Sequence, residues 1–372
     1  MSRVSPATPP DDCARLQDNS KQVVYVCDSA PREINDIILN DITHLIHWAI
    51  VFIITPTISI LGIIGNFLSL IVLAKHGFHK SSNVLLFSLA ISDILFMIGI
   101  NGPTKIMYEW DLGGFVYPRT TAHVLYVLYQ LVDALNWTTG VTSLSIPVLV
   151  MVERLIAVFL PLRFASLVTV RRTVIAIVTP LIFAIILQTY IRTWFRFEYT
   201  FDRARNKSVG VAARTDIYLA TRLVAQCLEI FFNSFFVFVI FVGCGCVAIG
   251  VKMRLVTKRR LTMTNRVCGQ KTGKMDSDST RTTKMLLCLC IFYTLASAPA
   301  ILSSVLPKFM TFPVFTEQPN FRSAGIFIYH LYQLAFAINS SNNFLIYVAT
   351  NKKFRDTFIS IVFRPKTDDR KS

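Results

Sequence analysis

Charged residues are scarce in this chain. Only 16% of its 372 residues are Asp, Glu, Lys or Arg, whereas 53% are hydrophobic and the mean hydropathy is +0.52. Soluble globular domains carry about 25% charged residues. The composition therefore excludes an ordinary soluble domain and indicates a membrane protein that crosses the bilayer several times.

The sequence patterns of enzymes and of two kinds of membrane protein are also missing. It contains no metal-ligand cluster, nucleophile elbow or phosphate-binding loop, so nothing suggests an enzyme. Transporters usually show internal repeats, and none is found. A light-driven retinal protein needs a lysine in its last span, and no lysine lies between Arg322 and Lys352.

Seven apolar segments are long enough to cross about 30 Å of hydrocarbon as helices. They cover residues 48–74, 84–107, 123–160, 174–191, 217–251, 285–306 and 324–350. We predict an all-α membrane protein: an extracellular tail (1–46), a seven-helix transmembrane bundle (47–350) and a cytoplasmic segment (351–372). In that last segment Phe354, Phe358 and Ile361 recur at helical spacing, which predicts a short amphipathic helix along the inner membrane surface.

The third segment is the most polar of the seven. Its polar residues are Asp133, Asn136, Thr138, Thr139, Thr142, Ser143 and Ser145. A helix that faces only lipid would not tolerate them, so we expect this helix to lie among the others.

The distribution of basic residues predicts the orientation. Segments 75–80, 153–172, 252–284 and 351–372 hold 23 of the 38 Lys and Arg residues but only six of the 22 acids. The positive-inside rule makes this side cytoplasmic, with 252–284 a flexible inner loop, and places the amino terminus outside the plasma membrane. The first 40 residues lack the basic start and apolar core of a signal peptide, so we expect the first span to direct its own insertion. Because this topology explains the basicity, no nucleic-acid partner is required.

One pair of charges interrupts the inner end of the third segment. Glu153 and Arg154 stand within the apolar run 148–164, and a charge in hydrocarbon costs about 2.5–3.5 kcal/mol even on the lenient insertion scale. The simple alternative is an arginine that extends to the headgroups at a helix end. An adjacent acid and base at this depth favour a functional site.

A polar layer is predicted near the middle of the bundle. Asp93 lies eleven residues in from Ser82, Ser143 eleven residues from Arg154, and Asn339 eleven residues from Thr350, about 16 Å from the inner side at 1.5 Å per residue. Asn66, Ser340 and Asn343 lie close to the same depth. The layer is consistent with hydrogen bonds between helices, with a protonated Asp93, or with a site for a monovalent cation.

Several motifs agree in order and position with one receptor family. They are Gly65-Asn66, Leu89-Ala90-Ile91-Ser92-Asp93, Glu153-Arg154-Leu155, Pro161-Leu162-Arg163 and the helix from Phe354 to Phe358. With seven spans in register, the chain resembles a rhodopsin-like (class A) G-protein-coupled receptor over residues 48–363. The stretch 161–169 resembles molluscan chemosensory receptors, and invertebrate peptide receptors are similar.

The resemblance implies a function and a set of switch residues. A receptor of this family converts binding of an extracellular ligand into activation of a heterotrimeric G protein; the alternative is a seven-span transporter or channel. The implied coupling and switch residues are Glu153, Arg154, Pro161, Leu162, Pro299, Asn343 and Tyr347. A resting-state sodium ion, the only cofactor implied, would be bound by Asp93, Ser143, Asn339 and Asn343.

Some family motifs are altered. The sixth-helix motif reads Ala296-Ser297-Ala298-Pro299, which keeps the kinking proline but has no aromatic residue before it. The seventh-helix motif reads Asn343-Phe344-Leu345-Ile346-Tyr347 and lacks its proline. The switching mechanics are therefore expected to differ in detail.

The family's outer disulfide has no candidates here. Tyr129 stands at the third-helix position, and residues 192–216 contain no cysteine. Cys13 and Cys27 are the cysteines expected to face the oxidising exterior; a bridge between them would contribute roughly 3 kcal/mol, and two free thiols are the alternative. Asn206-Lys207-Ser208 predicts a glycosylation site.

The ligand pocket is expected in the outer half of the bundle. Its candidate residues are Lys105, Asp133, Asn136, Glu229, Tyr329 and Gln333. Amine receptors of the family carry an Asp where this chain has Asn136, which argues against a simple amine. The basic outer loop that contains Arg192, Arg196 and Arg214 favours ligands with acidic groups, or is ordinary surface charge. Amino acids, other small chemosensory molecules and short peptides all remain open.

Overall fold

The computed structural model describes residues 13–17, 23–27, 45–110, 114–202, 206–233, 236–264, 285–297 and 319–362. The chain divides into two compact units, Met1–Trp48 and Ala49–Ser372, which we describe separately. In the first unit, strands β1 (Cys13–Gln17) and β2 (Val23–Cys27) pair antiparallel, with Cys13 opposite Cys27.

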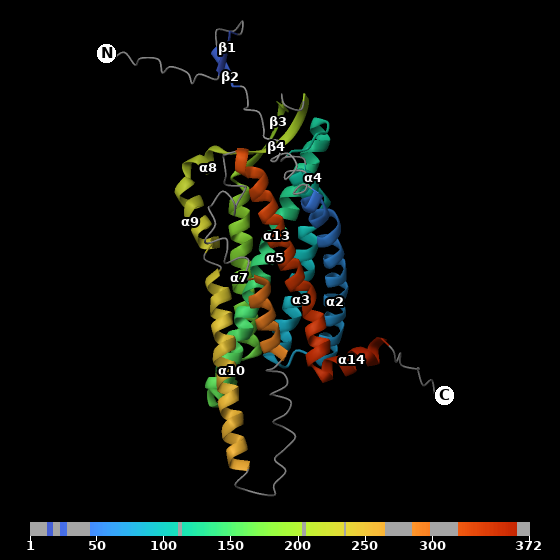
Figure 1. The fold of residues 1–372 in the computed structure, drawn as a ribbon, viewed down its shortest axis with the longest axis vertical. Coiled ribbons are helices and arrows are strands. Elements are labelled where there is room, and N and C mark those ends of the chain that lie inside the picture. Colours follow the sequence, from blue (N-terminus) through green and yellow to red (C-terminus); the bar gives the residue numbers. More distant parts are fainter. Residues whose placement is uncertain are drawn as a thin grey trace, which may run out of the picture. The chain divides into compact units, whose positions relative to one another are not determined.

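The second unit is a helix bundle (Figure 1). Its longer helices are α2 (Thr55–His76), α3 (Ser81–Ile100), α5 (Arg119–Phe159), α7 (Val170–Arg192), α9 (Arg222–Asn233), α10 (Phe236–Thr264), the helix Met285–Ser297, α13 (Pro319–Thr350) and α14 (Lys352–Val362). A π-helical turn, η1 (Ile50–Ile54), precedes α2, and a short helix, α4 (Pro103–Trp110), follows α3. The predicted all-α fold class is confirmed.

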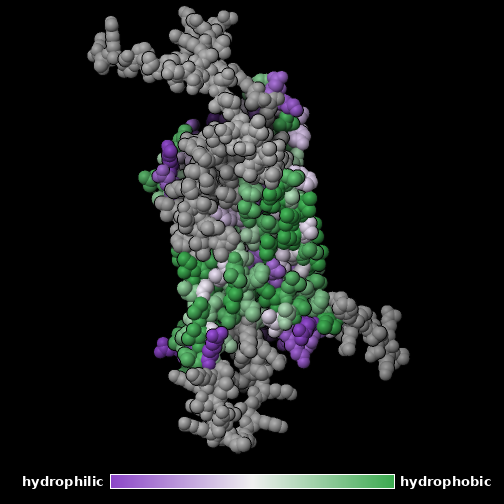
Figure 2. All heavy atoms as spheres, viewed as in Figure 1, coloured by the Kyte–Doolittle hydropathy of each residue, from purple (hydrophilic) through white to green (hydrophobic). Residues whose placement is uncertain are grey.

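Much of the bundle's surface is apolar. Among the described residues, five helices are long and apolar enough to span a membrane, and Met285–Ser297 is a shorter apolar helix. Figure 2 shows mainly hydrophobic residues along the described part of one face, with hydrophilic residues gathered toward the ends. An apolar surface of this extent is stable in contact with lipid rather than water.

Helix α5 is the central helix, as its polar residues predicted. It packs against α3, α7 and α10, and it continues through Pro147 without a break. Close approach to α3 depends on Gly99, where an added Cβ would lie 2.8 Å from the Asn136 Cα. This contact brings the polar side of α5 against α3 and toward the bundle interior.

The loop after the fifth span differs from the prediction. Helix α10 continues past the predicted end of the span to Thr264, whereas residues 252–284 were expected to form a flexible loop. Residues 252–264 contain neither Gly nor Pro and are rich in Lys, Arg, Leu and Met, which are good helix formers, so the helical hydrogen bonds continue past the apolar segment. The expectation of a loop was therefore wrong for these residues.

The segment between α7 and α8 (Asp216–Ala220) forms a β-hairpin. Strands β3 (Phe195–Asp202) and β4 (Lys207–Arg214) pair antiparallel. Asn206 lies at the turn with a φ of 50°, a left-handed conformation that Asn tolerates better than most residues. It is exposed, as a glycosylation acceptor must be.

Candidate functional site

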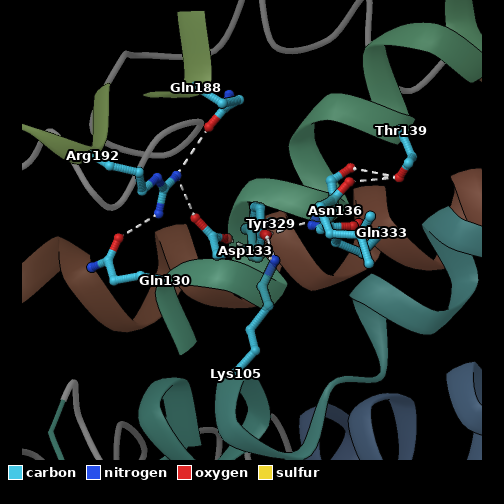
Figure 3. A network of polar contacts seen from close by, with 10 residues as sticks. Lys105, Gln130, Asp133, Asn136, Thr139, Gln188, Arg192, Tyr329 and Gln333 are labelled. Carbon is cyan, nitrogen blue, oxygen red and sulfur yellow. Dashed lines mark hydrogen bonds and ion pairs between the residues drawn. The ribbon is translucent and has the colours of Figure 1, made fainter. Parts of the chain in front are cut away.

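A buried ion cluster joins α4, α5 and α7 (Figure 3). Lys105 Nζ lies 3.1 Å from Asp133 Oδ1, and an Arg192 guanidinium nitrogen lies 2.8 Å from Asp133 Oδ2. The carboxylate thus binds one cation through each oxygen. The Lys105 and Asp133 side chains are 2% and 11% exposed, so this ion pair is largely withdrawn from solvent, whereas Arg192 is partly exposed at 21%. Removing one partner of a buried pair typically costs about 3–5 kcal/mol.

The seventh-span helix α13 contributes to the same cluster. Lys105 Nζ donates to the Tyr329 hydroxyl at 2.7 Å and lies 5.3 Å from the centre of its ring. Gln333, one turn further along α13, donates through Nε2 to the same hydroxyl at 2.6 Å. We call Lys105, Asp133, Arg192, Tyr329 and Gln333 the outer cluster.

Two buried carbonyl oxygens lie one turn deeper than the ion pairs. Asn136 follows Asp133 by three residues and is 2% exposed, and Gln333 follows Tyr329 by four. Among the described residues, neither Asn136 Oδ1 nor Gln333 Oε1 has a hydrogen-bond partner. A buried acceptor without a donor is costly, so both oxygens are able to bind an N–H or O–H group.

The structure thus brings together five of the six predicted ligand residues. Glu229 lies in α9, and its side chain is outside the described residues. Arg192 was noted only as a loop charge, yet it is a full member of the cluster and is held by Gln130 at 2.8 Å and Gln188 at 3.0 Å. The four-residue spacing of Gln188 and Arg192 on one helix was the signal that could have revealed it.

An aromatic cluster stands where the family places its disulfide. Tyr129 stacks on Tyr108 with ring centroids 4.3 Å apart, and Tyr108 packs against Phe115 at 5.2 Å. Phe115 and Gly210 exchange two backbone hydrogen bonds of 2.9 and 3.0 Å, which tie the hairpin to the segment before α5. Phe197 of the hairpin packs on Tyr126 of α5 at 5.5 Å. Stacking and backbone pairing thus fix the hairpin beside the outer cluster.

Asp93 of α3 is the centre of a second polar site. Its side chain is fully buried (0% exposed) and accepts hydrogen bonds from Ser143 Oγ at 2.5 Å, Ser340 Oγ at 2.9 Å and Asn343 Nδ2 at 2.6 Å. We call these four residues the Asp93 layer. Polar residues of α5 and α13, which were predicted to lie near the depth of Asp93, therefore contact its carboxylate directly.

The oxygen atoms of the Asp93 layer fit a hard cation. A carboxylate, two hydroxyls and an amide are ligand types that such cations prefer, and each hydroxyl that donates to Asp93 still has lone pairs. No basic side chain pairs with Asp93 in the part of the chain that the structure describes. Ser340 supplies the third hydrogen bond to Asp93. Asn339 was predicted as a ligand and is buried, but it is not one of these donors.

The inner site centres on Glu153 and Arg154. Both side chains are buried and form an ion pair with each other. Glu153 also accepts from Ser82 at 2.6 Å and from Ser81 at 3.1 Å, and Arg154 donates to Ser82 at 2.5 Å. The two serines begin α3, so the pair is held against the first turn of that helix. Sequence reasoning missed the serines, although Ser82 had been used to measure depth.

The other predicted switch residues lie in different environments. Pro161 and Leu162 are in a short 3-10 turn (Pro161–Arg163), where Leu162 is 99% exposed. Tyr347 is buried against Phe354 of α14, with ring centroids 5.5 Å apart. Pro299 is outside the described residues. Because Leu162 is apolar and almost fully exposed, it is available to contact another protein.

Comparisons with known proteins agree with these sites. The family model described as 7 transmembrane receptor (rhodopsin family) matches residues 65–347. The galanin-like G-protein coupled receptor npr-9 of Caenorhabditis elegans is 25% identical over 336 residues, which cover 83% of this chain and 73% of that protein. A probable G-protein coupled receptor of the same nematode, B0563.6, is 28% identical over 158 residues, which cover 41% of this chain and 35% of that protein.

Proposed function

The chain belongs to the rhodopsin family of seven-transmembrane receptors, and from this premise we propose that it binds a short extracellular peptide and activates a heterotrimeric G protein through Arg154. The observation that carries the proposal is the buried outer cluster, which offers charges and unpaired carbonyl oxygens on α4, α5, α7 and α13. The relative named as galanin-like supports a peptide ligand. A small chemosensory molecule is the second candidate, because Lys105 and Arg192 both lie within 3.1 Å of Asp133, so the charged groups are close together.

The inner site supports a role in coupling. Arg154 contacts Glu153 and Ser82, and Glu153 in turn accepts hydrogen bonds from both serines at the start of α3. The guanidinium is therefore restrained within the bundle. Breaking these contacts would release the Arg154 guanidinium at the same end of α5 that the turn containing the exposed Leu162 follows. We propose that Arg154 and Leu162 contact the G protein once these contacts are broken. We also propose that α14 lies on the inner leaflet of the plasma membrane, with Lys352 and Lys353 near lipid headgroups.

The test measures signalling in cells that express the chain with a promiscuous G protein. Glu153→Gln should raise basal signalling several-fold, because it removes the charge that restrains Arg154. Arg154→Ala should abolish the response to peptide pools, and Leu162→Ala should weaken it. Surface abundance of each variant is the control.

Two results would contradict this proposal. The first is an unchanged peptide response in Arg154→Ala at normal surface abundance. The second is substrate uptake or an ion current in cells that lack the G protein, which would favour a transporter or channel.

A further inference from the structure

An exposed serine lies in the short segment that joins α5 to α7. Ser166 belongs to α6 (Phe164–Leu167), a helix of only four residues, and it is exposed. Residues 161–167 form only short turns, and the residues that flank them are not helical: Leu160 has a φ of −128° and Val168 a φ of −105°. Such a segment opens at little cost, because few hydrogen bonds hold it. An enzyme can therefore bind Ser166 in an extended conformation.

The sequence around Ser166 is basic on both sides. Arg163 stands three residues before the serine, and Arg171 and Arg172 follow it. No acidic residue lies within ten positions of Ser166 in either direction. Protein kinases select their substrates partly by charge pattern, and kinases with acidic residues in the substrate groove select arginines that precede the serine. The pattern Arg-x-x-Ser indicates a substrate of a kinase of this kind.

Arginine side chains already lie close to Ser166 in the structure. The Ser166 hydroxyl donates to the Arg163 carbonyl oxygen at 2.9 Å. An Arg172 guanidinium nitrogen donates to the Ser166 carbonyl oxygen at 2.5 Å and to that of Leu167 at 3.2 Å. In the described part of the chain, neither Arg163 nor Arg172 pairs with a carboxylate. A phosphate on Ser166 would therefore have two guanidinium groups within reach, and such hydrogen bonds are charge-assisted.

The same segment contains the residue proposed to contact the G protein. Leu162 precedes Ser166 by four residues and is 99% exposed. The charge bias predicts that residues 153–172 face the cytoplasm, where kinases and ATP are present. A phosphoserine carries about −1.5 to −2 charges at pH 7. A hydrated charge so close to Leu162 would oppose the burial of this apolar side chain against a partner.

We propose that Ser166 is phosphorylated by a kinase that selects basic sequences, and that the phosphate, held by Arg163 and Arg172, weakens coupling through Leu162. In the reaction the Ser166 hydroxyl oxygen bonds to the γ-phosphorus of ATP, the bond from that phosphorus to the bridging oxygen breaks, and ADP leaves. The hydroxyl proton passes to the catalytic Asp of the kinase. The effect on coupling rests on the proposed function, whereas the modification itself does not.

The first experiment measures phosphorylation of the purified receptor in detergent with magnesium and ATP. The catalytic subunit of the cyclic-AMP-dependent kinase selects basic sequences and is the test enzyme; casein kinase II selects acidic sequences and is the control. Mass spectrometry locates the phosphate within the tryptic peptide 164–171. This peptide also contains the exposed Thr169, which has no arginine among the five residues before it and is an internal control.

We expect the test enzyme to phosphorylate Ser166 and to leave Thr169 unmodified, and casein kinase II to leave both unmodified. Arg163→Gln should lower phosphorylation of Ser166 at least fivefold, because the arginine that precedes the serine is lost. Arg172→Gln removes an equal charge after the serine and should be phosphorylated like the wild type. No phosphate on Ser166, or equal phosphorylation in Arg163→Gln and the wild type, would overturn the inference.

The second experiment measures basal signalling in cells that express Glu153→Gln, which the proposed function predicts to signal without ligand. Adding Ser166→Asp should lower this signal at least threefold at equal surface abundance, and adding Ser166→Ala should leave it unchanged. Equal signals from the two double variants would overturn the effect on coupling and leave the proposed function standing. If Glu153→Gln raises no signal and Arg154→Ala leaves the peptide response unchanged, the proposed function fails, and the first experiment alone decides the modification.

Discussion

Three buried carboxylates of this receptor are stabilised in three different ways. Asp133 binds two cations, Glu153 binds one cation and two hydroxyls, and Asp93 is held only by neutral donors. Hydrogen bonds to a charged group contribute about 1.5–3 kcal/mol each, which offsets part of the cost of burial. Asp93 is therefore the one of the three carboxylates that, when ionised, has no cationic partner among the described residues.

We predict that the Asp93 layer binds sodium in the resting receptor. An ion that binds the folded resting state stabilises it by mass action, so sodium should raise the melting temperature of the purified receptor by a few degrees relative to choline at equal ionic strength. By linkage, sodium should also lower agonist affinity about fivefold or more. Asp93→Asn should lose both effects, because it removes the charged ligand. Equal sodium effects in the variant and the wild type, or none in the wild type, would rule the site out.

At the scale of elements, packed aromatic rings replace a covalent link. The hairpin β3–β4 is joined to the bundle by the Phe115–Gly210 backbone pair and by contacts among Tyr108, Tyr129 and Phe197. Stacked or tilted aromatic pairs contribute about 0.5–1.5 kcal/mol each beyond the area they bury. Several such contacts together are comparable with one disulfide, for which 2–4 kcal/mol is typical.

We predict that Tyr129→Ala destabilises the receptor by about 1–3 kcal/mol, because it removes two aromatic contacts, the stack on Tyr108 and the edge contact with Phe115. Thermal unfolding in detergent measures the loss. Tyr117→Ala, the same change at an exposed ring, is the matched control and should have little effect. Mild reductant should not lower the wild-type melting temperature, and Cys13→Ser should behave identically with and without it. Reductant sensitivity that persists in Cys13→Ser would show that another disulfide is present.

For the whole molecule, the charge bias predicts which end faces the cytoplasm. The basic segments 75–80, 153–172, 252–284 and 351–372 are all expected inside, and the hairpin with Asn206 outside. We predict that Asn206 carries a glycan. A glycosidase should then shift the wild-type band on a gel, and Asn206→Gln should remove that shift.

Epitope tags provide a second measurement of the same topology. A tag at the amino terminus should bind antibody on intact cells, and one at the carboxyl terminus only after permeabilisation. Labelling of the carboxyl-terminal tag on intact cells would contradict the orientation. The Asn206→Gln variant should still label at its amino terminus, which separates a missing glycan from a reversed topology.

The sequence by itself determined the class, the apolar spans and the depth of several polar groups. Composition and apolar length identify membrane helices because hydrocarbon excludes charges and unpaired backbone groups. The fixed rise of a helix placed Asp93, Ser143 and Asn339 at one level, although Ser340 and Asn343 are the α13 residues that donate to Asp93. Glu153 and Arg154 were identified from the sequence because two adjacent charges within an apolar segment are costly in hydrocarbon.

Only the tertiary structure decided which side chains meet. Ser340 rather than Asn339 reaches Asp93 because neighbouring residues on a helix differ by about 100° in direction while differing little in depth. Arg192 joins Asp133 because α7 packs against α5, a pairing that no local pattern in either helix reveals. The aromatic contacts of Tyr129 likewise depend on how the hairpin folds back. Depth follows from counting along one helix, but contact depends on how several helices rotate and pack together.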